Sequence, residues 1–168
     1  MVTVDETVAT WQAAELDRDA AALRRCLADD VVFISPLTDA FRFRGPEQVV
    51  EVLEASWQVF EDMRWHTALG TGDTRALFFH ATARGQQVEE AQLLRFDPAG
   101  LIRELTFYGR PLPGVTAVMT GIAGPLLRRQ NRPLMARLLG PATAPIAFLT
   151  KVGERRVVPL ADPAKARR

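Results

Sequence analysis

The spacing of hydrophobic residues changes near residue 62, and this change restricts the fold more than any other feature of the sequence. Before it, apolar side chains recur every three to four residues in three segments, at 4–14, 20–27 and 46–60, as on one face of a helix. After it, apolar and polar residues alternate, which is typical of strands with one buried face. Helices followed by an alternating sheet indicate an α+β fold.

Turn-forming residues divide both parts into elements. In the first part, the apolar run Val31–Ile34 predicts a strand that ends at Ser35-Pro36, and Gly45-Pro46 opens the third helix. In the second part, turns with glycine or proline separate four strands, which we expect at 63–69, 75–84, 87–96 and 101–108. The sheet therefore has at least five strands, mostly in an antiparallel meander, with the N-terminal helices covering one face.

The hairpin around Gly85 assigns side chains to the two faces of this sheet. A two-residue turn at Gly85-Gln86 pairs Phe79 with Gln92 and places the following residues on one face: Leu77, Phe79, Ala81, Ala83, Val88, Glu90, Gln92 and Leu94. Because this set is mainly apolar, we expect it on the concave, helix-covered face, where Glu90 and Gln92 are polar exceptions. His80 lies on the opposite face, and the face of His66 is left open. A one-residue slip would exchange the two faces.

The composition is that of an ordinary globular protein and predicts one domain. The 168 residues are 48% hydrophobic and 24% charged. The single cysteine, Cys26, excludes an internal disulfide, and its place on an apolar helix face predicts a buried thiol rather than a nucleophile. The N-terminus has acidic residues and no basic region before an apolar run, so we expect no secretory signal and a cytoplasmic protein.

The two parts of the chain carry opposite charge. Residues 1–110 hold 11 arginines and 18 acidic residues, a net charge of −7, whereas residues 111–168 hold 10 basic and 2 acidic residues, a net charge of +8. Such parts attract each other, within one subunit or between two. A basic tail that meets an anionic ligand or a membrane surface is the alternative. We expect no nucleic-acid partner, because the tail lacks interleaved aromatic side chains that stack on bases.

Residues 111–168 are expected to form a basic C-terminal extension. Its first part, 111–127, is uncharged, is interrupted by glycines and prolines, and is too short to span a membrane. We expect a basic packed helix at 126–139, a short strand at 155–160 and a disordered end at 161–168. The extension packs back on the domain or across a dimer. A lid over a pocket and a membrane-surface segment are the alternatives.

The order helix, helix, strand, helix, meander resembles the nuclear transport factor 2-like superfamily. Two short motifs add to this resemblance: Ala28-Asp29-Asp30 before the first strand and Arg42-Phe43-Arg44-Gly45 before the third helix. The superfamily includes ketosteroid isomerases, limonene epoxide hydrolase and SnoaL-like polyketide cyclases. The resemblance covers about residues 5–110. It implies a cone-shaped α+β barrel domain at 1–110 with an apolar pocket, commonly paired into a homodimer through the outer sheet face.

An alignment with ketosteroid isomerase places different side chains at the isomerase's three functional positions. Trp11 stands in place of the oxyanion-hole tyrosine, Ser35 in place of the general-base aspartate, and Gln92 in place of the hydrogen-bond-donating aspartic acid. Serine cannot shuttle a proton near neutral pH without an added base, so we do not expect a steroid isomerase of the usual kind. The Gln92 amide and the Trp11 indole N–H can still polarise a carbonyl group.

Glu90 is the candidate catalytic residue. A carboxylate among leucine and phenylalanine side chains has its charged form disfavoured, which raises its pKa toward a useful range. Glu90 would then act as a general base on a C–H next to a carbonyl group, with Gln92 or Trp11 holding the oxyanion. The alternative is a solvated Glu90 at the open end of the hairpin, without a chemical role.

The remaining expectations concern ligands. The residues expected to bind an apolar small molecule are Trp11, Phe33, Ser35, Leu53, Trp57, Phe79, Gln92 and Phe107. An enzyme with this pocket would be a cofactor-free isomerase, cyclase or hydrolase of an apolar carbonyl or epoxide compound. A non-catalytic ligand-binding or dimerising module is the alternative. We expect no metal site, since the histidines at 66 and 80 lie 14 residues apart without clustered acids or thiols.

Overall fold

The computed structural model describes residues 2–164, with the backbone alone at residues 140 and 141, and has an α+β fold, as the sequence predicts. Three helices and two strands come first, then a four-strand meander, then two long helices. The elements are α1 (Val4–Asp17), α2 (Ala20–Cys26), β1 (Leu27–Ile34), β2 (Phe43–Arg44), α3 (Gly45–Ser56), β3 (Phe60–Leu69), β4 (Thr74–Ala83), β5 (Gln86–Phe96), β6 (Ile102–Arg110), α4 (Leu112–Arg129) and α5 (Pro133–Val152).

Local signals in the sequence set the starts of the N-terminal helices. The Thr3 side chain accepts a hydrogen bond from the Glu6 N–H while the Glu6 carboxylate accepts one from the Thr3 N–H, a reciprocal cap at the start of α1. Asp19 caps α2 in a similar way through the N–H of Ala22. Pro46 occupies the first turn of α3, where its missing N–H would have no partner in the helix.

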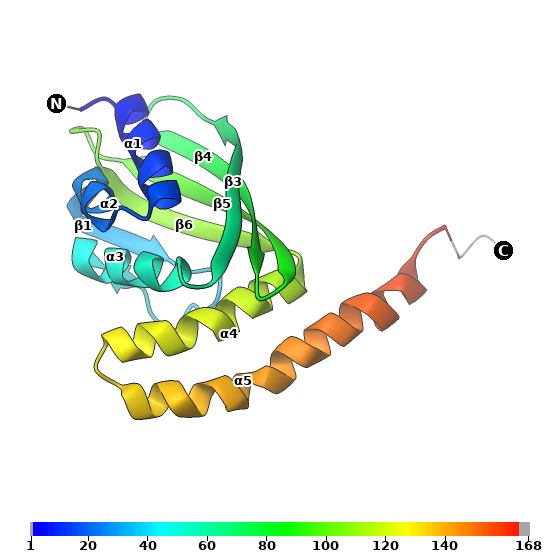
Figure 1. Cartoon of the computed structure of the whole chain (residues 1–168). Helices are drawn as coiled ribbons and strands as arrows, with labels where there is room; N and C mark the ends of the chain where they lie inside the picture. Colours follow the sequence, from blue (N-terminus) through cyan, green and yellow to red (C-terminus); the bar gives the residue numbers. More distant parts are fainter. Residues whose placement is uncertain (1, 165–168) are drawn as a thin grey trace.

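The six strands form one curved sheet in the order β2-β1-β6-β5-β4-β3. All neighbours run antiparallel except β1 and β6, which are parallel. The sheet stays open, with β2 and β3 as its edges, and α1, α2 and α3 cover its concave face (Figure 1). Most buried apolar side chains lie between these helices and the sheet, and Cys26 is among them, as expected.

The β4–β5 hairpin differs from the predicted register by two residues. The two turn residues are Arg84 and Gly85, both with positive φ, and Phe79 therefore pairs with Glu90 instead of Gln92. The prediction was wrong because it put glycine first in the turn; turns of this kind take glycine readily at the second central position. A shift of two leaves every side chain on its face, so Glu90 and Gln92 are buried on the concave side as expected.

Helix α4 packs across one end of the sheet and contacts α3, β4, β5 and β6 (Figure 1). We expected the glycines of this segment to interrupt regular structure. Instead they lie within α4 and let the helix pack closely against its neighbours. A Cβ atom at Gly114 would collide with the carbonyl oxygen of Gln87, and one at Gly121 would lie 2.6 Å from Cγ1 of Val59. Among the described residues, no helix combines the length and the hydropathy that crossing a bilayer requires.

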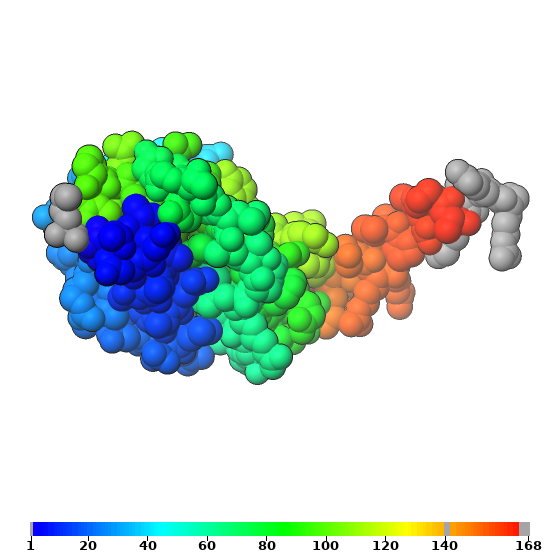
Figure 2. All heavy atoms as spheres, turned by 90° about the horizontal axis from the view of Figure 1, so that it is seen from above, coloured from blue at the N-terminus to red at the C-terminus, as the bar shows by residue number. Residues whose placement is uncertain are grey.

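The end of the chain contradicts two element predictions. The helix expected at 126–139 is divided between α4 and α5 at residues 130–132, because Asn131 takes a positive φ and Pro133 starts a new helix. The strand expected at 155–160 is absent, and a π-helical turn (Gly153–Val157) and a 3₁₀ turn (Val158–Ala161) continue from α5. The last half of α5 and these turns project beyond the main body (Figure 2). Part of the expected disordered end, 165–168, lies outside the described residues.

The close approach at Gly114 leads to a stability prediction. We expect Gly114→Ala to lower the free energy of unfolding by about 1–3 kcal/mol, because α4 must shift away from β5 to make room for the methyl group. Urea unfolding followed by circular dichroism measures the change. Gly153→Ala is the matched control. A Cβ there meets nothing within 4 Å, and the residue has helical dihedral angles, so we expect a neutral or slightly stabilising effect. Equal stability of the two variants would contradict the prediction.

Candidate functional site

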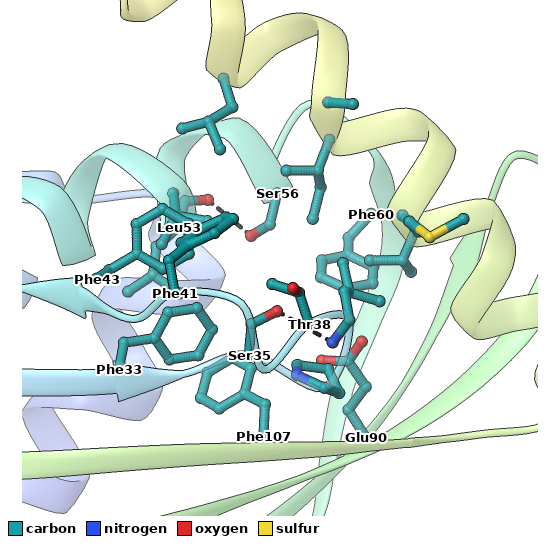
Figure 3. Close-up of a pocket in the computed structure, with 18 residues that line it drawn as sticks. Phe33, Ser35, Thr38, Phe41, Phe43, Leu53, Ser56, Phe60, Glu90 and Phe107 are labelled. Carbon is teal, nitrogen blue, oxygen red and sulfur yellow. Dashed lines mark hydrogen bonds between the residues drawn. The ribbon is translucent and has the colours of Figure 1, made fainter. Parts of the chain in front are cut away.

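A cavity of about 250 Å³ lies between the concave face of the sheet, α3 and α4 (Figure 3). Its walls are almost entirely apolar. The residues that line it are Phe33, Ser35, Pro36, Leu37, Thr38, Phe41, Phe43, Val52, Leu53, Ser56, Phe60, Glu90, Phe107, Val118, Met119, Ile122, Ala123 and Leu126. A concave apolar space with a few polar groups is the usual form of a small-molecule site.

Each wall follows from the periodicity of the element that supplies it. Strand β1 ends at the cavity and contributes Phe33, whose ring packs edge-on against Phe107 of β6 at 4.7 Å between centroids. Val52, Leu53 and Ser56 come from one face of α3. The last wall belongs to α4, whose lining residues recur at helical spacing from 118 to 126. This wall lies in the part of the chain predicted to be an extension.

Glu90 is the one ionisable residue among those that line the cavity. It lies on β5 between Phe79 of β4 and Gly109 of β6, and only 3% of its surface is exposed. Gly109 is packed closely beside it: a Cβ atom there would lie 2.8 Å from Cγ2 of Val115 and in ordinary contact, at 3.6 Å, with the Glu90 side chain. Burial raises the pKa of Glu90 to about 8, and repulsion from the carboxyl group of Glu15 adds to the increase.

Glu15, on α1, is a second buried carboxyl group, which the sequence analysis missed. Its Oε2 accepts a hydrogen bond of 2.7 Å from the indole N–H of Trp57, while its Oε1 is buried without a hydrogen-bond partner among the described residues. Burial raises its pKa to about 7, and the hydrogen bond from Trp57 limits the increase. The signal was its spacing: it lies four residues after Trp11 and seven after Val8 on the buried face of the helix.

The two buried carboxyl groups affect each other's charge. A negative charge on Glu15 makes ionisation of Glu90 less favourable, and both groups are kept from water, so the doubly charged state is the costly one. The indole N–H of Trp57 stabilises a negative charge on Glu15. Glu90 has no such donor in the described structure and has the higher pKa. Near neutral pH Glu90, with the higher pKa, therefore keeps its proton at the cavity wall.

The structure divides the predicted ligand-binding residues into two groups. Phe33, Ser35, Leu53 and Phe107, together with Glu90, line the cavity. Trp11, Trp57, Phe79 and Gln92 are buried in the core without being among its lining residues. Within that second group, the indole N–H of Trp11 donates a hydrogen bond of 2.8 Å to Oε1 of Gln92. This indole N–H therefore already has an acceptor inside the core.

The polar groups of the cavity other than Glu90 are hydroxyls, and each has a local partner. Ser35 accepts a hydrogen bond from the backbone N–H of Leu37, and Thr38 accepts one from that of Ala40. Ser56 donates to the carbonyl oxygen of Leu53. These bonds shape the loop after β1 and the end of α3. They leave the carboxyl group of Glu90 as the strongest proton donor at the cavity surface.

The chain matches known proteins over most of its length. Residues 5–105 match the SnoaL-like domain. The crystal structure of a steroid delta-isomerase from Pseudomonas aeruginosa is 28% identical, with a TM-score of 0.69 over 80% of this chain and 96% of that one. A protein with a cystatin-like fold from Silicibacter pomeroyi DSS-3 is 26% identical, with a TM-score of 0.70 over 79% and 93%. No curated protein matches the chain.

A further solved structure shows the fold alone. It is a protein with a ketosteroid isomerase-like fold from Catenulispora acidiphila DSM 44928, in complex with trimethylamine, and is 22% identical, with a TM-score of 0.55 over 69% of this chain and 92% of that one. Residues 1–110 are about two thirds of the chain. The likeness over 80% of the chain to the Pseudomonas structure therefore extends into residues 111–168.

The buried carboxyl group of Glu90 leads to a prediction about pH and stability. Glu90 keeps its proton up to about pH 8 in the folded chain, but in the unfolded chain it releases the proton near its ordinary pKa of 4.5. The folded state therefore binds more protons between these values, and the free energy of unfolding falls as the pH rises through this window. Glu90→Gln removes the titrating group. We expect it to gain stability relative to wild type by several kcal/mol from about pH 5 to about pH 8.5, at about 1.36 kcal/mol per pKa unit.

Urea unfolding of both proteins at the two pH values measures this difference. Glu61→Gln is the control, because Glu61 is an exposed carboxylate on the same sheet and its loss should leave the pH profile unchanged. If the wild type and Glu90→Gln lose stability in parallel, Glu90 is not held in a protonated form by the fold.

Proposed function

The chain belongs to the SnoaL-like domain family, and we propose that it is a cofactor-free enzyme that acts on a compact, apolar carbonyl or epoxide compound. In this proposal the ligand occupies the cavity, and Glu90 in its protonated form donates a hydrogen bond, and then its proton, to the ligand's oxygen. The Glu90 carboxylate then takes a proton back, from the C–H next to the carbonyl group in an isomerisation or from the attacking water in an epoxide hydrolysis. The observation that carries the proposal is a single carboxyl group, protonated near neutral pH, on the wall of an otherwise apolar cavity.

The apolar walls support the choice of ligand class. Aromatic and aliphatic side chains make up most of the lining, so a charged ligand would lose much of its hydration without compensation. Drug-sized ligands occupy pockets of roughly 300–1,000 Å³. A cavity of about 250 Å³ fits a smaller molecule. One oxygen placed against Glu90 would satisfy the carboxyl group that the fold leaves without a hydrogen-bond partner.

The chemical role follows from the protonation state. A neutral carboxylic acid in an apolar site stabilises negative charge that develops on a carbonyl or epoxide oxygen, since a donor in low dielectric is worth more than one in water. Ketosteroid isomerase, which has a similar fold, is a known case of a carboxylic acid kept neutral by its apolar site. The sequence predicted Glu90 as a general base. The raised pKa leads us to propose a proton donor instead.

The relation to the Pseudomonas steroid delta-isomerase supports isomerisation among the possible reactions. Position 35 is a serine, whose hydroxyl is not a base near neutral pH. The proposal therefore rests on acid catalysis at Glu90 and not on the usual isomerase base. A non-catalytic ligand-binding module is the second candidate, because Glu90 has no second ionisable group beside it on the described cavity wall.

Glu90→Gln separates the two candidates. The protein is incubated with a panel of small apolar ketones, enones and epoxides, and products are measured by mass spectrometry. For a compound that is turned over, we expect Glu90→Gln to reduce kcat by roughly 10²–10⁴ while binding is kept, because the amide can donate a hydrogen bond but no proton. We also expect the wild-type kcat to fall above about pH 8, as Glu90 ionises. Compounds that bind without turnover would favour the ligand-binding module.

The position of the ligand is tested by filling the cavity from α4. Ala123→Phe places a ring in the space that the ligand needs. We expect it to weaken binding at least about tenfold, which corresponds to about 1.4 kcal/mol. Leu138→Phe adds a similar ring on the exposed face of α5 and serves as the control. Equal affinities of the two variants, measured by calorimetry, would place the ligand elsewhere.

A further inference from the structure

Two imidazole rings and a carboxylate meet on the outer face of the sheet, opposite the cavity. They belong to His66 on β3, His80 on β4 and Glu89 on β5, and one ligand atom of each lies within 4.8 Å of the other two. The rings of the two histidines stack with centroids 4.3 Å apart. These are the two histidines of the whole sequence.

The pairing of the strands explains how residues distant in sequence come together. His80 and Glu89 are direct partners across the β4–β5 hairpin. On β3 the register shifts between Trp65 and Thr67, so that His66 is an extra residue without a partner of its own on β4. A β-bulge of this kind re-aims a side chain. Here it leaves His66 on the outer face, beside His80.

Hydrogen bonds and ion pairs orient the cluster. Nδ1 of His66 lies 2.9 Å from Oγ1 of Thr67, which leaves Nε2 facing Glu89 Oε1 at 3.6 Å. The other carboxylate oxygen of Glu89 is 3.3 Å from a guanidinium nitrogen of Arg110. In metal sites, a ligating histidine usually has its second ring nitrogen held by a hydrogen bond, and a ligating carboxylate is held in the same way. Both features are present here.

We propose that His66, His80 and Glu89 bind one divalent transition-metal ion of the Zn²⁺ type. Two imidazole nitrogens and one carboxylate oxygen are a ligand set that zinc takes in open sites, at roughly 2.0–2.2 Å per ligand. The ligand atoms must approach one another by about an ångström for such bonds, and partly exposed side chains can do so through small rotations. Imidazole ligands favour Zn²⁺, Ni²⁺ or Cu²⁺ over Mg²⁺ and Ca²⁺.

The surroundings leave the ion accessible. The three residues line a surface hollow of about 790 Å³, which also contains Asp62, Arg64 and Arg110. Three protein ligands leave a fourth position free for water or another ligand. The two guanidinium groups oppose a cation, and the carboxylate of Asp62 partly offsets them. The site should therefore bind zinc more weakly than a structural site with four protein ligands.

This inference does not depend on the proposed function, since the cluster lies on the opposite face of the sheet. It differs from the expectation of no metal site, which stays a prediction until zinc binding is measured. The 14-residue separation of the histidines gave no indication, because the bulge at His66 and the cross-strand pair at Glu89 are properties of the folded sheet.

Calorimetric titration of the untagged full chain with Zn²⁺ tests the site. We expect one ion per chain for the wild type. We expect His66→Gln and His80→Gln each to lower the zinc affinity by at least roughly 10- to 100-fold. Loss of a residue that merely hydrogen-bonds to a metal ligand already costs that much, and these variants remove a ligand itself. Glu104→Gln is the control, because Glu104 is a partly exposed carboxylate of the same sheet, paired with Arg95 outside the cluster. It should bind zinc like the wild type.

Thermal unfolding adds a second measurement. Zn²⁺ should raise the Tm of the wild type and of Glu104→Gln but not that of His80→Gln, since an ion that binds only the folded chain stabilises it. Circular dichroism without metal checks that the variants fold. The proposal is overturned if the wild type gives no saturable zinc binding or if one ion is held per two chains. It is also overturned if a variant with both His66→Gln and His80→Gln binds zinc as tightly as the wild type.

Discussion

The burial of two carboxyl groups in one apolar interior is the constraint on which the candidate site depends. Glu15 and Glu90 come from α1 and β5, and the packing of helices on the concave face keeps both from water. Taking charge out of water is costly, so the fold favours a protonated form that an exposed carboxylate would not have near neutral pH. The indole N–H of Trp57 donates to Glu15 and limits the rise in its pKa, whereas Glu90 has no such donor among the described residues and has the higher pKa. The chemistry at the cavity is therefore a result of core packing.

The two faces of the sheet could be predicted well. The alternation of apolar and polar residues indicates which face a strand residue lies on, even where its partner on the next strand is assigned wrongly. A turn placed one residue late moves the pairing of β4 and β5 by two, and both Glu90 and Gln92 stay on the concave face. Helix α4 could not be predicted in the same way. Its glycines and prolines are also the residues of turns, and the close packing of the glycines becomes visible only beside β5 and beside Val59, in the loop after α3.

The candidate site could be predicted where one strand or helix supplies the signal, and not where distant segments meet. Phe33, Leu53 and Phe107 line the cavity because each lies on the apolar face of its own element. Helical spacing indicates that Glu15 is buried. Its effect on Glu90 could not be predicted in this way, because the two residues lie 75 positions apart in the sequence. Trp11 and Gln92, expected at the pocket, bond to each other in the core instead. The resemblance to the nuclear transport factor 2-like superfamily is confirmed by the family match and by the solved structures.

Helix α4 lies after residues 5–105, which match the SnoaL-like domain, yet it supplies one wall of the cavity. The two carboxyl groups themselves come from α1 and β5, and the indole that bonds to Glu15 comes from Trp57 at the end of α3. Part of the volume and shape available to a ligand is thus encoded in a different stretch of chain from the acid that would act on it. Substitutions along the inner face of α4, at Met119 or Ile122, would change the space open to a ligand without replacing either carboxyl group. Proteins with the same core can in this way diverge in the molecules they accept by evolving a single helix.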